Sequence, residues 1–210
     1  MRPVAVPAIE PAGTVAETIN DLWWLMLALG TAVFVVFAAL LARGLLRRGH
    51  GEAAPDNRLL TRRWVLGGGV LMPVAVLVTV FGATVKSMRA TSGGASPGAL
   101  TVEIIGHQWW YEVRYPDDGV SADVLHLPLG RRIELRLRSE DVIHSFWVPE
   151  LAGKMDMLPD KTNTLVLQAD KPGSYVARCA EFCGRHHAEM HLPVIAEPAE
   201  RFAAWLTEQR

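Results

Sequence analysis

Two long runs of the chain contain no charged side chain, and they constrain the fold more than any other feature. One extends from Leu22 to Ala42 and the other from Trp64 to Val85. Each is close to the roughly 20 residues that a helix needs to cross the hydrocarbon core of a bilayer. A buried helix of a soluble protein is the alternative, but two such runs so close together favour membrane spans. We therefore expect a pair of spans at about residues 22–43 and 64–85.

The segment between the two runs is strongly basic. Only Glu52 and Asp56 oppose its arginines, which are Arg43, Arg47, Arg48, Arg58, Arg62 and Arg63. Short loops that are rich in arginine and lysine next to membrane helices stay in the cytoplasm. We therefore expect this loop to be cytoplasmic and both termini to lie on the outer side of the membrane. Residues 1–21 show no cationic start followed by a short apolar core, so a cleavable signal peptide is not expected.

A different kind of sequence follows a linker at residues 91–100 that is rich in glycine and serine. Ile133, Leu135 and Leu137 alternate with charged residues, which is the two-residue period of a strand with one buried face. Further strand candidates, separated by Gly, Pro and Asp, are 101–105, 110–115, 122–127, 165–169, 174–178 and 192–196. Many short strands at such spacing indicate a sandwich or a barrel.

A terminal helix is expected to begin at Pro198, with Phe202, Trp205 and Leu206 on one face. The predicted organisation is therefore a tail and membrane hairpin over 1–90, a linker over 91–100, and a β-domain with a short C-terminal helix over 101–210. The net charge of −1 points to no particular charged partner, and we expect no nucleic-acid partner.

Twelve residues of the β-domain bring together two thiols, two imidazoles and a thioether. The segment from Cys179 to Met190 reads Cys-Ala-Glu-Phe-Cys-Gly-Arg-His-His-Ala-Glu-Met and contains both cysteines of the chain. Sulfur and imidazole ligands suit copper better than hard cations, which prefer oxygen. Two thiolates, from Cys179 and Cys183, can bridge two metal ions. Such a pair needs one more imidazole from elsewhere, and His144 is the best candidate.

Other interpretations of the same residues remain open at this point. Cys179 and Cys183 are able to form a disulfide if this part of the chain lies outside the cytoplasm. They are also able to hold a structural zinc ion together with His186, His187 or His191, although the usual ligand spacing is not met. Met190 alone is typical of core packing.

The motif Cys179-x-Glu181-x-Cys183-x3-His187-x2-Met190, preceded by Asp-Val-Ile-His144-Ser, resembles the binuclear copper (CuA) motif of cytochrome c oxidase subunit II. The similarity covers nearly the whole chain. It implies a cupredoxin-like Greek-key sandwich behind a two-helix membrane hairpin. It also implies that the copper ligands are His144, Cys179, the backbone carbonyl of Glu181, Cys183, His187 and Met190. The family spacing selects His187 and leaves His186 as a surface residue.

The resemblance implies further roles. The segment Gly-His-Gln-Trp109-Trp-Tyr-Glu is similar to the aromatic stretch of subunit II that receives electrons, with Trp109 as the entry residue. In the family, the side chain of Glu181 also binds magnesium or manganese at the boundary with subunit I. An acidic residue often precedes the second span to serve proton entry, but Thr61 stands there in this chain.

As a whole, the resemblance implies the electron-entry subunit of a terminal respiratory oxidase in the bacterial inner membrane. Such a subunit accepts electrons from cytochrome c at the copper pair and passes them to haem in subunit I. The implied partners are subunits I and III, cytochrome c and the lipid bilayer. Carboxylates of the β-domain are candidates for steering a basic cytochrome: Asp117, Asp118, Asp123, Glu140, Asp141, Glu150, Asp156 and Asp160.

Two alternative functions remain candidates. A quinol oxidase subunit II has the same fold without copper, and the intact ligand set argues against it. A copper-containing electron-entry subunit of a nitric oxide reductase is the other rival. The chain has no Cys-x-x-Cys-His sequence, so no haem is expected to be attached to it.

The arginine-rich loop yields a topology prediction. A cysteine introduced at Asp56 should be protected from membrane-impermeant thiol reagents that are added outside the cell, whereas one introduced at Gly94 should react. Labelling of intact cells, compared with labelling after permeabilisation, measures this difference. The reverse pattern would place the β-domain in the cytoplasm.

Overall fold

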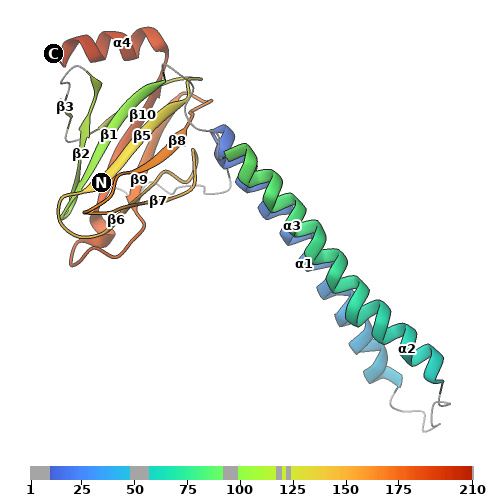
Figure 1. Ribbon diagram of the computed structural model, residues 1–210. Coiled ribbons are helices and arrows are strands. Elements are labelled where there is room, and N and C mark those ends of the chain that lie inside the picture. The colour runs from blue at the N-terminus through green and yellow to red at the C-terminus, as the bar shows by residue number, and fades with distance from the viewer. Residues whose placement is uncertain (1–9, 48–56, 92–98, 117–119, 122–123, 210) are drawn as a thin grey trace. The chain divides into compact units, whose positions relative to one another are not determined.

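The computed structural model describes residues 10–47, 57–91, 99–116, 120–121 and 124–209 (Figure 1). Its chain forms two compact units. One consists of residues 21–89, and the other combines residues 1–20 with residues 90–210. The division expected from the sequence, with the tail and hairpin over 1–90 and the β-domain over 101–210, stays a prediction.

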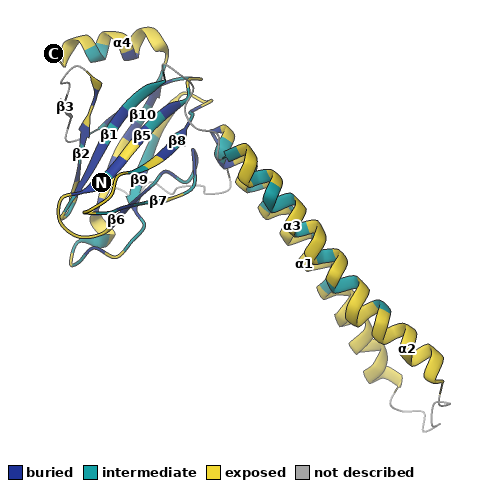
Figure 2. Cartoon of the chain, viewed as in Figure 1, coloured by how far each residue is buried: buried dark blue, intermediate teal, exposed yellow. Residues whose placement is uncertain are grey.

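The two uncharged runs lie within two long helices. The first is α1 (Thr14–Arg47), and the second is continuous over Arg58–Thr91 and comprises α2 (Arg58–Leu66), the π-helical turn η1 (Gly67–Leu71) and α3 (Met72–Thr91). Each has 34 residues and is long and apolar enough to cross a membrane. Their apolar side chains are exposed along most of the length, which Figure 2 draws in yellow.

The π-helical turn has a local cause in the sequence. Pro73 follows it closely, and a proline ring clashes with the carbonyl group four residues earlier, which here belongs to Gly69. The amide of Met72 donates to the carbonyl of Gly67, five residues back, so the helix is wider at this point. Gly67, Gly68 and Gly69 have no other atom near the position of an added side chain, so the turn is uncrowded.

The β-domain is a sandwich of two five-stranded sheets. One sheet has the order β3-β2-β1-β5-β8 and the other has the order β4-β10-β9-β6-β7. The β1–β5 and β10–β4 pairs are parallel, and the remaining pairs are antiparallel. The strands are β1 (Leu100–His107), β2 (Trp110–Arg114), β3 (Val120–Ser121), β4 (Leu125–Pro128), β5 (Ile133–Ser139), β6 (His144–Trp147), β7 (Met155–Met157), β8 (Asn163–Leu167), β9 (Gly173–Cys179) and β10 (His191–Glu197).

Alternation along the strands builds the core between the sheets. Ile133, Leu135 and Leu137 of β5 are fully buried, and the charged residues between them face outward. Tyr111 of the first sheet meets Phe146 of the second edge to face, with ring centroids 5.8 Å apart. Each of these large apolar side chains contributes about 1.5–3 kcal/mol when it leaves water. The core therefore fixes the end of β6 from which His144 projects.

The C-terminal helix α4 (Ala199–Glu208) packs against the sandwich, and Pro198 immediately precedes it. Phe202 is buried, and Trp205 stacks on the imidazole of His126 in β4 at a centroid distance of 4.0 Å. The predicted fold class is confirmed: two long apolar helices, a cupredoxin-like β-domain and a short C-terminal helix. The sequence analysis did not find β6 and β7, because neither short strand has a clear alternation.

The segment before α1 packs on the β-domain. The amide of Ala12 donates to the carbonyl of Glu150 at 2.8 Å, and the carbonyl of Ala12 accepts from the amide of Asp170 at 2.8 Å. Gly13 lies so close to this surface that an added Cβ would be 2.2 Å from the carbonyl oxygen of Gln168. The contact therefore requires glycine at residue 13, because any side chain there would collide with the β-domain.

This close approach predicts the effect of Gly13→Ala. The methyl group should push the segment away from the β-domain and destabilise their contact by about 1–3 kcal/mol, as overpacking does elsewhere. Hydrogen exchange of the Ala12 and Asp170 amides should become faster. Gly153→Ala is the matched control, because its added Cβ would be at an ordinary 3.6 Å from Ile19. Unchanged exchange in Gly13→Ala would contradict this account of the contact.

Candidate metal centre

One loop carries most of the candidate ligands and is closed at its base by a hydrogen bond. It leaves β9 at Cys179 and returns to β10 after the short 3₁₀ turn η3 (His187–Glu189). The amide of Cys179 donates to the carbonyl of Met190 at 3.1 Å. Gly184 has φ = +120°, a backbone conformation that residues with a Cβ rarely adopt. This glycine lets the chain turn within the loop. The loop thus brings Cys179 and Met190, which both carry a sulfur atom, close together.

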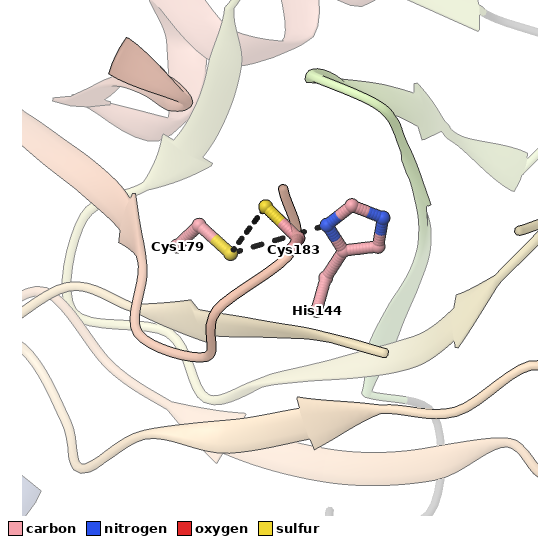
Figure 3. Close-up of side chains that lie close together, drawn as sticks. All are labelled: His144, Cys179 and Cys183. Carbon is pink, nitrogen blue, oxygen red and sulfur yellow. Dashed lines mark hydrogen bonds between the residues drawn. The ribbon is translucent and has the colours of Figure 1, made fainter. Parts of the chain in front are cut away.

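The two thiols lie side by side and are free. Their Sγ atoms are 3.7 Å apart, and both residues are buried. The Nδ1 atom of His144 is 3.9 Å from Sγ of Cys179. Figure 3 shows these three side chains directed toward one another, and their ligand atoms all lie within 4.8 Å.

The remaining predicted ligands lie around the same pair of sulfurs. The Nδ1 atom of His187 is 3.6 Å from Sγ of Cys183, and the Sδ atom of Met190 is 3.8 Å from that sulfur. The backbone carbonyl oxygen of Glu181 is 3.1 Å from Sγ of Cys179. Each thiol therefore has one imidazole and one weaker donor next to it.

The imidazole of His144 is held by its surroundings. Its Nε2 atom is 2.7 Å from Oδ1 of Asp141, so Nε2 donates to that carboxylate and Nδ1 is the ring nitrogen that faces the sulfurs. The other carboxylate oxygen of Asp141 accepts from the amide of Gln108 at 2.6 Å. A Cβ on Gly106 would be 2.8 Å from Cδ2 of His144, so only glycine leaves room for this ring. No role was expected for Gly106 or Gln108, and Asp141 was expected only among the carboxylates that steer a cytochrome.

The two thiols of the site differ in how readily they ionise. Burial opposes ionisation of Cys179, but hydrogen bonds with His144 and with the backbone at Glu181 and Ser145 lower the pKa of its thiol. Burial and the neighbouring Cys179 sulfur raise the pKa of Cys183. Burial opposes the charged form of Asp141, but hydrogen bonds from His144 and two backbone amides lower the pKa of that carboxyl. The surroundings therefore favour ionisation of Cys179 over that of Cys183.

The predicted entry residue lies against the loop. The indole Nε1–H of Trp109 donates to the carbonyl of Cys183 at 3.2 Å, and the side-chain amide of Gln108 donates to the same oxygen at 2.8 Å. His186 packs edge to face on Trp109, with centroids 4.7 Å apart, and its Nδ1 atom lies 3.0 Å from Oε2 of Glu189. His186 is therefore engaged away from the sulfurs.

Several of the candidate carboxylates lie next to a cation or are buried. Glu140 pairs with Arg138, Asp156 is 3.5 Å from Lys154, and Glu150 is buried. The side chain of Glu181 is 3.6 Å from the same lysine. Thr61 lies exposed in α2. Of the remaining acidic candidates, Asp141 accepts from His144 and Gln108, and Asp160 is exposed. Asp117, Asp118 and Asp123 lie outside the described residues.

A family model described as "Cytochrome C oxidase subunit II, periplasmic domain" matches residues 120–198. Cytochrome c oxidase subunit 2 of Alkalihalophilus pseudofirmus is 30% identical over 207 residues, which cover 95% of this chain and 60% of that protein. Quinol oxidase subunit 2 of Bacillus cereus is also 30% identical over 209 residues, covering 95% of this chain and 72% of that relative. The chain thus spans only about 60% of the length of the first of these relatives.

The crystal structure of the periplasmic domain of subunit II of cytochrome oxidase (CoxB) of Bradyrhizobium japonicum superposes with a TM-score of 0.50 and 27% identity. The match covers 56% of this chain and 95% of that one. Alternative cytochrome c oxidase subunit 2 of Bradyrhizobium diazoefficiens is 30% identical over 230 residues, covering 94% of this chain and 81% of the relative. The β-domain, the long apolar helices and these matches agree, and the chain therefore belongs to the cytochrome c oxidase subunit II family.

Proposed function

We propose that this chain is the electron-entry subunit of a terminal respiratory oxidase, and that it accepts electrons from cytochrome c at a binuclear copper centre for transfer to haem in subunit I. The observation that carries the proposal is the pair of buried thiols 3.7 Å apart, with one imidazole Nδ1 atom next to each sulfur. When bound, a copper pair supplies a one-electron redox centre at this position.

The donor set fits copper. The proposed ligands are the side chains of His144, Cys179, Cys183, His187 and Met190, together with the carbonyl of Glu181. Two thiols and two imidazoles alone also suit a structural zinc ion. The thioether of Met190 and the carbonyl of Glu181, each within 3.8 Å of a thiol sulfur, exceed the four ligands of such a site. Soft sulfur ligands of both kinds favour copper.

Hydrogen bonds and packing within the protein position these donors. Asp141 fixes the tautomer of His144, and Gly106 leaves room for its ring. The hydrogen bond between Cys179 and Met190 closes the loop, and the pairing of Phe146 with Cys179 attaches it to β6. Ligands that are held by two sheets move little between redox states, which favours fast electron transfer.

Trp109 is the proposed residue of electron entry. Its indole N–H donates to the carbonyl of Cys183, so one hydrogen bond joins the ring to the backbone of a proposed ligand. The ring is only partly buried, and its position beside the loop lets a partner reach it. Trp109 therefore offers a short path from the surface to the sulfurs.

We also propose a placement of the subunit in the membrane. The helices cross the inner membrane, the loop between them is cytoplasmic, and the β-domain is periplasmic next to subunits I and III. The side chain of Glu181 is available to a magnesium or manganese ion at the boundary with subunit I once it leaves Lys154. A quinol oxidase subunit remains the rival, because some relatives carry that name. The complete donor set supports the copper-bearing alternative.

Metal content tests the proposed centre. Purified protein loaded with copper should contain two coppers per chain, with one unpaired electron shared between two nuclei in electron paramagnetic resonance. Cys183→Ser should abolish the shared signal, because one thiolate cannot bridge the pair symmetrically. Met190→Leu should keep both coppers and shift the redox potential, because a weak axial ligand tunes the metal.

The choice between the adjacent histidines provides a matched control. His187→Ala should disrupt the centre, whereas His186→Ala should retain two coppers and their spectrum. A single copper with a one-nucleus pattern, or a Cys179–Cys183 disulfide in copper-replete protein, would refute the binuclear centre. Loss of copper in His186→Ala alone would show that the second imidazole was assigned wrongly.

Electron entry is tested by Trp109→Phe. The ring stays apolar, so folding and copper loading should survive, but the hydrogen bond to the carbonyl of Cys183 is lost. Stopped-flow oxidation of a c-type cytochrome by the assembled oxidase should slow markedly, because the coupling path through this hydrogen bond is interrupted. Trp205→Phe on α4 is the control and should be normal. An oxidase that takes electrons from quinol but from no cytochrome would refute the proposed function itself.

A further inference from the structure

One buried hydroxyl group of the first sheet reaches the residues that carry the proposed copper ligands. Tyr111 of β2 is only 1% exposed and belongs to the core between the two sheets. A hydroxyl group in such a core costs free energy unless it has a hydrogen-bond partner, and a phenylalanine would avoid this cost. The partners of the Tyr111 oxygen therefore show what the hydroxyl group is used for.

The first partner is the backbone of Ser145, the residue that follows the proposed ligand His144. The hydroxyl group of Tyr111 donates to the carbonyl of Ser145 at 3.0 Å. The amide of Ala180, which follows Cys179, donates to the same carbonyl at 3.3 Å. One carbonyl oxygen thus connects the phenol with the segments of two proposed ligands.

The second partner is the sulfur of Cys179. Burial raises the pKa of Tyr111, and the charge of Cys179 and a side-chain hydrogen bond with it raise that pKa further. Phe146, which pairs with Cys179 across the strands, packs edge to face on Tyr111 with ring centroids 5.8 Å apart. The phenol is therefore held next to this sulfur and keeps its hydrogen.

The two acceptors of this hydrogen differ in strength. A hydroxyl hydrogen rotates to suit its surroundings, and a hydrogen bond to an ionised group is roughly twice as strong as one to a neutral group. A thiol that coordinates a metal ion is deprotonated. When Cys179 is a metal ligand, its sulfur is thus the stronger acceptor, and the carbonyl of Ser145 retains the bond from Ala180.

We propose that Tyr111 is a positioning residue that donates a hydrogen bond to the thiolate of Cys179 and thereby raises the redox potential of the copper centre. The inference rests on the proposed function and adds a residue that tunes it. A hydrogen bond to the thiolate draws electron density from the sulfur, so the sulfur donates less to the metal. The reduced state, with its smaller positive charge, is then favoured. Hydrogen bonds around a cysteine ligand tune copper sites in general.

Tyr111→Phe in the copper-loaded full chain tests the inference. The ring and its packing on Phe146 are kept, so the variant should fold, bind two coppers and retain the shared electron paramagnetic resonance signal. The equilibrium constant for reduction by a redox mediator should fall by about tenfold, the size of one hydrogen bond to a charged group. Tenfold corresponds to about 59 mV for a one-electron couple. Spectroelectrochemical titration of the copper absorption measures this shift.

Tyr115→Phe is the matched control. Tyr115 is 5% exposed, and its hydroxyl group accepts from the amide of His126 at 2.7 Å and donates to the carbonyl of that residue at 3.0 Å. The variant also loses a buried hydroxyl group of the β-domain, but one that is bonded to β4, which carries no proposed ligand. Thermal unfolding should show a loss of stability in both variants, whereas only Tyr111→Phe should change the potential.

A second variant reverses the direction of the effect. 3-Fluorotyrosine, incorporated at position 111 by codon suppression, has a more acidic phenol and is therefore a stronger hydrogen-bond donor. The potential of the copper centre should rise above the wild-type value. This measurement decides the question on its own if Tyr111→Phe does not retain two coppers.

Three outcomes overturn the inference. The first is an unchanged potential in a Tyr111→Phe variant that retains the shared signal. The second is an equal shift in Tyr115→Phe, and the third is an unchanged or lower potential with 3-fluorotyrosine at position 111. All three leave the proposed function intact, because the wild-type chain still holds its copper pair. A wild-type chain without the shared signal refutes the proposed function together with this inference.

Discussion

The hydrogen bond between the amide of Cys179 and the carbonyl of Met190 closes the loop on which the site depends. It places the last residue of β9 beside the residue that precedes β10, so the thioether reaches the thiols. The antiparallel pairing of β9 and β10 continues directly from this bond, with Arg178 opposite His191. The sulfur positions are therefore set by the register of the sheet, and the loop between them needs only a glycine turn at Gly184.

Much of this arrangement was predictable because it is local in the sequence. The residues from Cys179 to Met190 indicated a metal site, and the many short strands, such as the one around Ile133, indicated a sandwich or a barrel. The supports of His144 were not predictable in the same way. Gly106 and Gln108 meet Asp141 and His144 only through the pairing of β1 with β5, which no local pattern reveals. The contact of Ala12 with Glu150 and Asp170 is equally remote in sequence.

The charge that the β-domain presents at its surface depends on how its carboxylates are paired and not only on how many it contains. The β-domain is rich in carboxylates, yet Glu140, Asp141 and Asp156 each lie next to a cation, an imidazole or a backbone amide. An ion pair of this kind presents little net field beyond about one Debye length, ~8–10 Å. A count of acidic residues therefore overstates how strongly this surface attracts a basic partner.

The two imidazoles next to the thiols are held by different parts of the chain. His144 is fully buried and is oriented by Asp141 and enclosed by Gly106, so it depends on the first sheet as well as the second. His187 belongs to the loop itself and packs against Phe182, whose ring is exposed. A change in the β1–β2 segment therefore acts on the thiol of Cys179 through His144. A change at Phe182 acts instead on the thiol of Cys183 through His187, which is 3.6 Å from that sulfur.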